Sequence, residues 1–308
     1  MKEEGIIFSI KHKSTGDGPG LRTTALLKGC PLRCVWCHNP ESRSFKPQLV
    51  FDQDSCHNCF TCLTTCKNDA HYVEDERHCV DFEKCLADGY CVKSCPFGAV
   101  YMMGKAFTPD TFIEMVEPEI DDLRKLGGGI TISGGEPMSQ FGFTLSVLKK
   151  AKGKNIHTCL DTSGYAKTAL FEEVAPYVDI FLYDYKETDP IRHQEFTGVN
   201  QQLILKNLER LVEMKKSVIL RCPIVPGYND TDSHFQGIAH LARQYNLKVD
   251  ILPFEDLAEI KARKMGIELA IAEIEEAPPE TVKLWIQKLN DLGCKVNNAG
   301  RILDAKQR

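Results

Sequence analysis

The chain has 308 residues, which is enough for one large α/β domain that also carries an insert. Its net charge is -5 and its pI is near 6.0, and no run of lysines or arginines forms a basic stripe, so we expect no nucleic acid partner. The N-terminal residues are unlike a signal peptide, and no segment approaches the roughly 18 apolar residues that suggest a membrane span. We therefore expect a cytoplasmic protein with no membrane partner, and we expect a monomer.

Six apolar runs that end in Gly, Pro, Asp or Asn predict parallel strands, because helix-period segments lie between them. In chain order, the expected strands cover residues 23–28, 129–133, 156–160, 180–185, 218–225 and 249–254. The expected helices cover residues 108–125, 140–152, 166–175, 201–215, 231–245 and 280–291. Right-handed crossovers would turn these units into an open barrel or a doubly wound sheet, and periodicity alone does not choose between the two.

In either arrangement, ligands bind at the C-terminal ends of the strands, and polar or glycine-rich motifs follow four of the expected strands. These motifs are Gly29-Cys30, Gly134-Gly135-Glu136-Pro137, Asp161-Thr162-Ser163-Gly164 and Asp184 to Lys186. Four loops would therefore converge on one face. The alternative for the glycine pair is an ordinary tight turn, and the alternative for Asp161 to Ser163 is a helix N-cap.

The cysteines are concentrated in one part of the chain, since 11 of the 14 lie between Cys30 and Cys95. In a cytosolic chain of this size, such clustering indicates metal or redox chemistry and not disulfides. The other three, Cys159, Cys222 and Cys294, stand alone on apolar segments. We interpret them as buried, inert thiols.

Cys30, Cys34 and Cys37 form a CxxxCxxC motif directly after the first expected strand, and Trp36 lies within it. Three thiolates leave one iron of a [4Fe-4S] cluster without a protein ligand, and an open iron can bind a substrate. The spacing therefore predicts a catalytic cluster. The alternative is a zinc site with a more distant fourth ligand such as His38.

Residues 49–104 separate the first two expected strands, hold eight cysteines and show little periodicity, which predicts an inserted domain. The first motif in this segment, CxxCxxCxxxC, has the spacing of bacterial ferredoxins, in which the fourth cysteine commonly serves the other cluster. A second, diverged copy has an aspartate at its second position. If the fourth cysteine of each copy serves the other cluster, one cluster is expected on Cys56, Cys59, Cys62 and Cys95. The other is expected on Cys66, Cys85, Cys91 and one further ligand.

Two residues could supply that further ligand. Cys79 precedes Cys85 and offers a thiolate, which is the softer and better ligand for iron, so we take it as the expected one. Asp88 is favoured instead by the unchanged spacing of the second copy. If neither binds firmly, a labile or three-iron cluster would follow.

Three stretches resemble the radical SAM superfamily, and specifically the activating enzymes of glycyl radical enzymes. They are GDGPGLRT at residues 16–23, KGCPLRCVWCHNPES at residues 28–42 and SGGEP at residues 133–137. The resemblance covers essentially the whole chain. It implies an α/β fold with a partial (β/α)6 radical SAM barrel in residues 1–48 and 105–308, and a ferredoxin-like inserted domain in residues 49–104.

The resemblance also implies an oxidoreductase of anaerobic metabolism. Such an enzyme cleaves S-adenosylmethionine (SAM) reductively, and the resulting 5′-deoxyadenosyl radical removes a hydrogen from a glycine of a partner glycyl radical enzyme. Three [4Fe-4S] clusters are expected, one that binds SAM and two auxiliary ones that pass electrons from a flavodoxin or ferredoxin. The alternative for the insert is a structural role in docking the partner.

By the same resemblance, Lys186 would pair with the SAM carboxylate, Asp184 would lie nearer the reaction centre, and Glu136 would accept a hydrogen bond from the SAM ammonium. The expected SAM-binding set is Trp36, Gly134, Gly135, Glu136, Asp161, Thr162, Ser163, Lys186 and Arg221. Asp161, Thr162 and Asp184 would also match a monovalent-cation site. Many relatives have a histidine after the sixth strand, but this chain has Glu255 there, so no imidazole role carries over.

Two other functions compete with this prediction. One is a radical SAM enzyme that acts on a small molecule or a peptide, because the SAM motifs fix radical generation but not the hydrogen donor. The other is a ferredoxin-like electron carrier without catalysis. The CxxxCxxC motif and the four convergent loops argue against a carrier.

Overall fold

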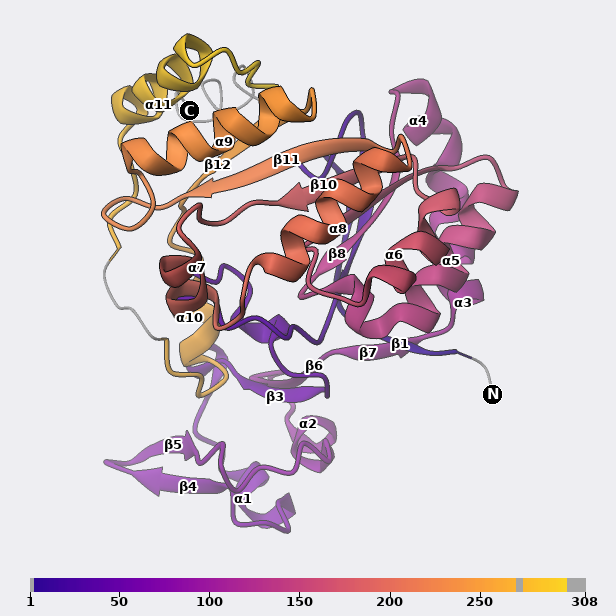
Figure 1. Cartoon of the computed structure of the whole chain (residues 1–308). Helices are drawn as coiled ribbons and strands as arrows, with labels where there is room; N and C mark the ends of the chain where they lie inside the picture. Colours follow the sequence, from indigo (N-terminus) through magenta and orange to yellow (C-terminus); the bar gives the residue numbers. More distant parts are fainter. Residues whose placement is uncertain (1–2, 270–273, 298–308) are drawn as a thin grey trace.

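The computed structural model describes residues 3–269 and 274–297, and its largest element is an eight-stranded sheet (Figure 1). Neighbouring strands lie in the order β12-β11-β10-β9-β8-β2-β1-β7. The six parallel strands are β2 (Arg22–Leu27), β8 (Gly129–Gly134), β9 (His157–Thr162), β10 (Ile180–Asp184), β11 (Ser217–Ile224) and β12 (Lys248–Pro253). Each of them overlaps a strand expected from the sequence, so that prediction is confirmed.

The strand order settles the choice that periodicity left open. The parallel strands follow one another across the sheet in the same order as along the chain, as they do in a barrel, whereas a doubly wound sheet reverses direction at a switch point. Strands β12 and β7 remain at the two edges, so the barrel is partial. The expected fold class is therefore confirmed.

Two antiparallel strands of the large sheet were not expected from the sequence. Strand β1 (Gly5–Ser14) pairs with β2, and β7 (Lys105–Phe107) pairs with the other side of β1. The second half of β1 is exposed and carries lysine and histidine, so it lacks the apolar run by which the other strands were found.

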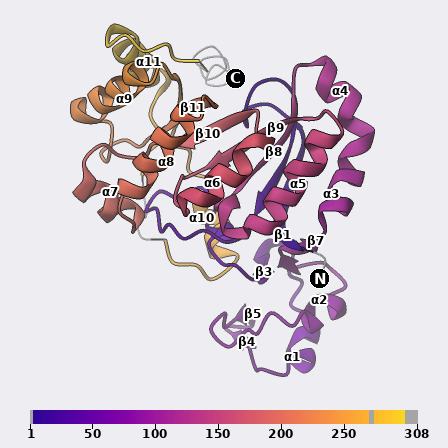
Figure 2. The same ribbon diagram turned by 45° about the vertical axis from the view of Figure 1, so that its right-hand side comes forward.

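Helices α5 (Phe141–Gly153), α6 (Thr168–Val174) and α8 (Gln202–Glu213) lie side by side over one face of the sheet (Figures 1 and 2). The expected helix at residues 108–125 is divided into α3 (Pro109–Val116) and α4 (Ile120–Lys125) by a short 3-10 turn that contains Pro118. The remaining expected helices are α9 (Asp232–Gln244) and α11 (Pro279–Asp291). Helices α7 (Pro190–Thr197) and α10 (Ala258–Arg263) were not expected.

The main core lies between the sheet and these helices. Phe112 of α3, Val147 of α5 and Phe171 of α6 are fully buried in one cluster with Ile132 and Phe181 of the strands. Burial of each such side chain stabilises the fold by roughly 1.5–3 kcal/mol, which explains why the strands are continuous apolar runs. This rigid scaffold fixes the loops at the C-terminal ends of the strands.

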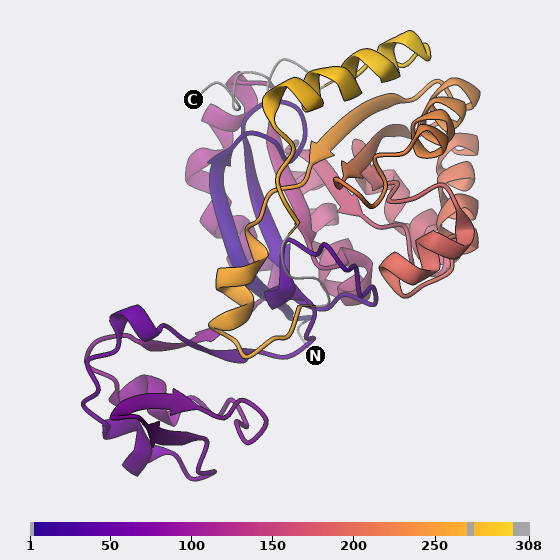
Figure 3. The same cartoon turned by 90° about the vertical axis from the view of Figure 1, so that its left-hand side faces the viewer.

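Residues 49–104 contribute two small sheets and two short helices. Strands β3 (Gln48–Phe51) and β6 (Val100–Met103) form one antiparallel pair, and β4 (His71–Glu74) and β5 (Arg77–Val80) form the other. The views in Figures 1 and 3 both place β4, β5 and α1 (Thr61–Thr65) in a lobe apart from the large sheet, with β3 between them. Helix α2 (Tyr90–Ser94) contacts α1.

Within the described part of the chain, no helix combines the length and the apolar character needed to cross a membrane.

Candidate functional site

Three thiols come together in the loop that follows β2. Cys34 is buried, and Cys30 and Cys37 are half-buried. Burial, together with the charges of neighbouring thiols, raises the pKa of Cys30 to about 12, and burial raises the pKa of Cys34 to about 11. Thiols crowded in this way lose their protons only when a cation binds them. Three cysteines that can bind a cation as thiolates are the ligands that an iron-sulfur cluster requires.

The chain itself shapes this loop. Gly29 adopts a φ of +90°, and its N–H donates to the carbonyl of Ser42 at 2.6 Å. The guanidinium of Arg43 donates to the carbonyl of Cys34 at 2.7 Å, and that of Arg33 donates to the carbonyl of Cys30 at 2.7 Å. Two backbone carbonyls of the loop are thereby paired with cationic side chains.

The glycine pair after β8 allows close contact between two loops. A Cβ on Gly134 would lie 2.1 Å from the backbone nitrogen of Leu27, and a Cβ on Gly135 would lie 2.6 Å from the carbonyl oxygen of Gly29. Gly134 also has a φ of +118°. Only glycine fits both positions, so the pair is needed to hold the loop beside Cys30.

Glu136 is fully buried, and its carboxylate joins the loops after β8 and β9. One oxygen accepts from the N–H of Met138 at 3.0 Å and from the hydroxyl of Thr162 at 2.8 Å. The other accepts from the N–H of Ser163 at 2.8 Å and also from the Ser163 hydroxyl. These four hydrogen bonds fill the acceptor positions of the carboxylate, so the structure gives Glu136 a positioning role within the chain.

Two ion pairs lie at the C-terminal ends of β9, β10 and β11. Lys186 contacts the carboxylate of Asp184 at 2.7 Å, and Arg221 contacts the carboxylate of Asp161 at 3.3 Å. Ser133 donates a further hydrogen bond of 2.7 Å to Asp161. All four charged side chains are largely buried, so each one depends on its partner.

The charges in this group shift one another's pKa values. Burial raises the pKa of Asp161 to about 6, with Arg221 opposing the shift and Asp184 adding to it. Burial alone would lower the pKa of Lys186, but Asp184 and the thiols of Cys34 and Cys30 outweigh it and raise this pKa. Lys186 is therefore a fixed cation next to the three-cysteine loop.

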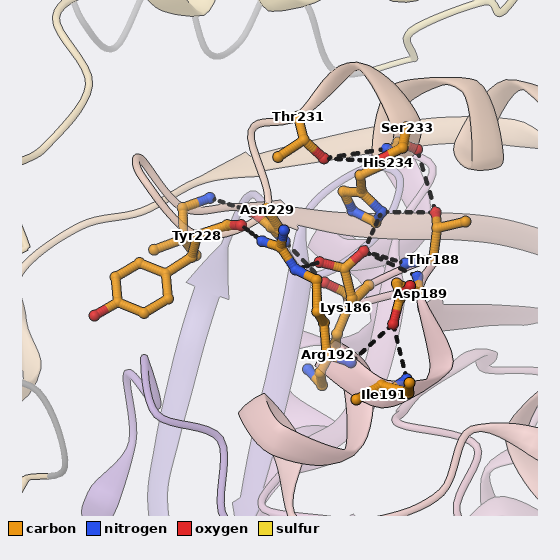
Figure 4. Close-up of polar contacts among 12 residues, drawn as sticks. Lys186, Thr188, Asp189, Ile191, Arg192, Tyr228, Asn229, Thr231, Ser233 and His234 are labelled. Carbon is orange, nitrogen blue, oxygen red and sulfur yellow. Dashed lines mark hydrogen bonds and ion pairs between the residues drawn. The ribbon is translucent and has the colours of Figure 1, made fainter.

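A polar network behind Lys186 anchors its backbone (Figure 4). The Asn229 amide donates to the carbonyl of Lys186 at 2.8 Å, and Arg192 donates to the carbonyl of Tyr228. His234 and Thr188 contact each other at 2.9 Å in the same network. Sequence reasoning missed these residues, because none of them belongs to a recognisable motif.

Aromatic side chains surround the other side of the three-cysteine loop. Trp36 is buried against Phe196 and Tyr228, with ring centroids 5.2 and 6.1 Å away. Phe254 lies on the same side, and a cavity lined in part by Trp36, Cys37 and Phe254 opens there. Glu255, which follows β12, is exposed.

His38 also lies on this side, with its ring 5.4 Å from that of Phe254. Burial and the nearby cations of Lys186 and Lys261 lower the pKa of His38 to about 4. The imidazole is therefore neutral at neutral pH.

Four of the eight cysteines in the insert line one cavity. They are Cys56, Cys59, Cys62 and Cys95. Phe60, Phe97 and Val100 complete its apolar wall. A compact set of four thiols in an apolar pocket fits an iron-sulfur cluster, and the set includes the cysteine from the second copy of the motif.

A second group of thiols lies nearby. Burial raises the pKa of Cys91 to about 11, and the charges of Cys85 and Cys66 add to that shift, so these three side chains are neighbours. Cys79 lies on β5, opposite Tyr72 of β4. Its role as a ligand stays a prediction.

Two buried histidines adjoin the first of these cavities and were missed by sequence reasoning. His78 lies 3.3 Å from the sulfur of Cys62 and 3.5 Å from that of Cys56. His71 contacts His78 at 2.8 Å. Cys62, His71 and His78 together form a possible metal-binding group, which overlaps the four-thiol cavity.

The three isolated cysteines are all buried and free of disulfides, in agreement with their interpretation as inert thiols. Cys159 and Cys222 lie on β9 and β11 in the core, and Cys294 follows α11.

Known proteins show which family has these features. A family model described as a 4Fe-4S single cluster domain matches residues 16–205. The isethionate sulfite-lyase activating enzyme of Oleidesulfovibrio alaskensis is 36% identical, over 84% of this chain and 86% of that protein. The choline trimethylamine-lyase activating enzyme of the same organism is 34% identical, over 94% and 96%. The 4-hydroxyphenylacetate decarboxylase activating enzyme of Clostridioides difficile is 36% identical, over 86% of each chain.

Among solved structures, a radical SAM methyltransferase from Sphaerobacter thermophilus matches with a TM-score of 0.53. The match covers 96% of this chain and 77% of that chain at 13% identity, so it supports the fold alone. The fold and the three-cysteine loop define a radical SAM protein. The chain belongs to the family of activating enzymes of glycyl radical enzymes. The expected family and enzyme class are therefore confirmed. This family uses a [4Fe-4S] cluster and SAM, which argues against the zinc alternative.

Proposed function

We propose that the three-cysteine loop after β2 holds the SAM-binding cluster through Cys30, Cys34 and Cys37. The observation that carries this proposal is the convergence of three crowded thiols beside the fixed cation Lys186, at the C-terminal end of the sheet. When bound, the cluster supplies the electron that cleaves SAM. The chain's own residues bind, orient and enclose the reactants.

Lys186 and Arg221 are largely buried cations near the C-terminal ends of β10 and β11, where an anionic group of SAM could reach them. Each already faces a carboxylate, so each cation is paired before a ligand enters and can be shared with the SAM carboxylate. Asp184 would then lie beside the reacting atoms, as expected. The Gly134–Gly135 pair and Glu136 hold the loops at the right separation, and Trp36 forms part of the cavity wall.

The monovalent-cation site remains a prediction. In this chain Asp161 and Asp184 already contact Arg221 and Lys186, and the hydroxyl of Thr162 donates to Glu136. A bound cation would have to compete with both basic side chains.

For residues 49–104, we infer a ferredoxin-like domain with two auxiliary clusters. The four thiols of the first cavity come from both copies of the motif, which supports the expected cross-ligation by Cys95. A cluster with four protein ligands has no open iron, so its role is electron transfer from a flavodoxin or ferredoxin to the SAM site. The protein substrate is a glycine-containing loop of a partner glycyl radical enzyme.

The first test is the detection of 5′-deoxyadenosine after anaerobic reduction of the reconstituted chain with dithionite in the presence of SAM. Cys34→Ala serves as the control that removes a ligand of the proposed cluster. Absence of the product from the wild-type chain would refute the proposal.

A second test concerns the hydrogen donor. A candidate glycyl radical enzyme is added to the same reaction, and its frozen sample is examined by electron paramagnetic resonance. A doublet from a glycyl radical is expected. Formation of 5′-deoxyadenosine together with hydrogen loss from a peptide or small molecule, and no such doublet with any candidate, would favour the competing substrate class.

A further inference from the structure

The two cysteine motifs of the insert fold into nearly the same local structure. In the first copy, Asn58 and Phe60 have φ values of 52° and 56°, and α1 begins directly after Phe60. In the second copy, Ala87 and Gly89 have φ values of 54° and 74°, and α2 begins directly after Gly89. Left-handed residues at the same two places in both copies give the two loops the same course.

The cysteines around these helices match in the same way. Cys62 of α1 and Cys91 of α2 are both buried. Cys66 and Cys95 each cap the end of their helix, with φ and ψ of -73° and 125° in one case and -82° and 109° in the other. The spatial match therefore extends over the whole motif.

Within this match, Asp88 occupies the position of Cys59. The sulfur of Cys59 accepts a hydrogen bond from the N–H of Thr61, and a carboxylate oxygen of Asp88 accepts one of 3.2 Å from the N–H of Tyr90. Both acceptors lie two residues before their donor, and both donors are the first residue of their short helix. Both side chains are exposed at the edge of their site.

Asp88 also adjoins the second group of thiols. Burial is the main cause that raises the pKa of Cys85, and the charges of Cys66 and Asp88 add to it. Asn68 holds the second oxygen of Asp88 at 3.2 Å. The carboxylate is thus fixed next to Cys85, which is one of the expected ligands and itself lies near Cys66.

Cys79 is placed differently. Successive side chains of a strand point to opposite faces, and the neighbours of Cys79 on β5, His78 and Val80, both pack toward the thiols of the insert. Cys79 therefore lies on the other face of the hairpin, opposite Tyr72, which is exposed. Reaching the second group of thiols would require the hairpin to be rebuilt.

We propose that a carboxylate oxygen of Asp88, and not the sulfur of Cys79, is the fourth protein ligand of the second auxiliary cluster, together with Cys66, Cys85 and Cys91. This inference rests on the proposed function, since it assumes that the insert holds two clusters. A carboxylate is a harder donor than a thiolate and suits iron in a sulfide cluster less well. The iron bound to Asp88 is therefore the one that leaves first on oxidation.

The oxidation step can be written in full. Ferricyanide takes one electron from the oxidised form, [4Fe-4S]2+, one Fe2+ ion leaves, and [3Fe-4S]+ remains on the three cysteines. The departing iron loses its bond to the Asp88 oxygen and its bonds to three sulfides. The carboxylate is left as a free anion. Ferricyanide becomes ferrocyanide.

The test uses the full chain with Cys30, Cys34 and Cys37 replaced by alanine, so that only the auxiliary clusters contribute iron and spectra. After anaerobic reconstitution and ferricyanide treatment, we expect this parent to lose about one iron per chain and to show the electron paramagnetic resonance signal of a three-iron cluster. Asp88→Cys should abolish both changes. Asp88→Ala should bind about one iron fewer per chain than the parent before any oxidant is added, and ferricyanide should then produce the three-iron signal without further loss of iron.

Cys79→Ser is the matched control and should behave as the parent does. A three-iron cluster in Cys79→Ser before oxidation, or iron loss from Asp88→Cys equal to that of the parent, would overturn the proposal. It would also fall if neither Asp88→Ala nor Cys79→Ser changed the iron content, because another group would then be the fourth ligand.

Failure of this inference can be told apart from failure of the proposed function. Formation of 5′-deoxyadenosine by the intact chain with dithionite depends on the SAM site alone. This assay therefore tests the SAM site whether or not Asp88 binds the second auxiliary cluster. A parent variant that binds no iron would instead show that the insert holds no clusters, and both the inference and the relay would be refuted while the SAM chemistry stood.

Discussion

The side-chain amide of Asn229 donates a hydrogen bond of 2.8 Å to the backbone carbonyl of Lys186. Asn229 also donates to the carbonyl of Pro223 at 2.7 Å and accepts from the N–H of Val225 at 2.7 Å, and it is fully buried. One side chain thus ties the loop after β11 to the residue that presents the cation of the proposed SAM site.

Replacing Asn229 with alanine should therefore weaken both stability and SAM binding. Three buried hydrogen bonds at about 1 kcal/mol each predict a loss of about 3 kcal/mol in the free energy of unfolding. We also expect a higher KM for SAM in 5′-deoxyadenosine formation, because Lys186 loses its backbone anchor. Asn290→Ala, an exposed position on α11, is the control. An unchanged KM in a folded Asn229→Ala variant would contradict the positioning role.

The proposed relay predicts a dependence on the electron donor. Cys59→Ala removes one thiol of the four-thiol cavity but leaves the SAM site intact. With reduced flavodoxin as the donor, the rate of 5′-deoxyadenosine formation should fall by at least about tenfold. With dithionite, a small reductant that can reach the SAM site directly, the loss should be much smaller.

Cys294→Ala is the control for this comparison, since Cys294 lies outside the insert and no role in electron transfer is proposed for it. Equal losses with flavodoxin and dithionite in Cys59→Ala would argue for a purely structural insert. The two rates are best measured on samples with matched iron content.

Much of the fold could be predicted, because each parallel strand is a buried apolar run with a polar motif at its end. The site was less predictable where contacts are long-range. The sequence predicts Glu136 as an acceptor for the SAM ammonium, and this stays a prediction. The hydrogen bonds of Glu136 with Thr162 and Ser163, which lie on the loop after β9, could not be predicted. No local pattern shows that contact.

The insert gives a second example. Softness of the donor favours Cys79 as an iron ligand, and that role stays a prediction. The sequence does not show the register of the β4–β5 hairpin, which determines the face on which this thiol lies. The buried pair His71 and His78 was missed for the same reason, since histidines seven residues apart on two short strands form no recognisable motif.

Gly266, in the barrel domain, packs closely against Phe82 of the insert, and a substitution there can test this contact. Gly266 follows α10, has a φ of +61°, and lies where a Cβ would be 2.2 Å from the ring of Phe82. Close by, Lys264 pairs with Asp52 at 2.8 Å. Gly266→Ala should push Phe82 away and destabilise the protein by about 2 kcal/mol, from backbone strain and overpacking.

Limited proteolysis should detect the result as faster cleavage within residues 49–104. Gly153→Ala is the matched control, because a Cβ there meets no atom within 4 Å. If Gly266→Ala resists protease as well as the wild type does, the contact with Phe82 does not hold the insert in place.

The last prediction concerns pH. His234 is fully buried, stacks on Tyr185 and contacts the hydroxyl of Thr188 at 2.9 Å, and burial lowers its pKa to about 3. In the unfolded chain the pKa is about 6.5, so the unfolded state binds a proton first as the pH falls. Protonation of His234 therefore does not lower the free energy of unfolding above pH 7, and it lowers this free energy progressively below about pH 6.5.

Between pH 7.5 and pH 5, this one histidine should remove about 2 kcal/mol from the free energy of unfolding. His234→Phe keeps the aromatic ring beside Tyr185 but cannot take a proton, so its stability should fall less over the same range. Denaturant unfolding of the cluster-free chain at several pH values measures the difference. His240→Gln, at an exposed position on the same helix, should keep the wild-type pH dependence. Parallel pH profiles for the wild type and His234→Phe would show that His234 does not cause the loss, whatever its burial.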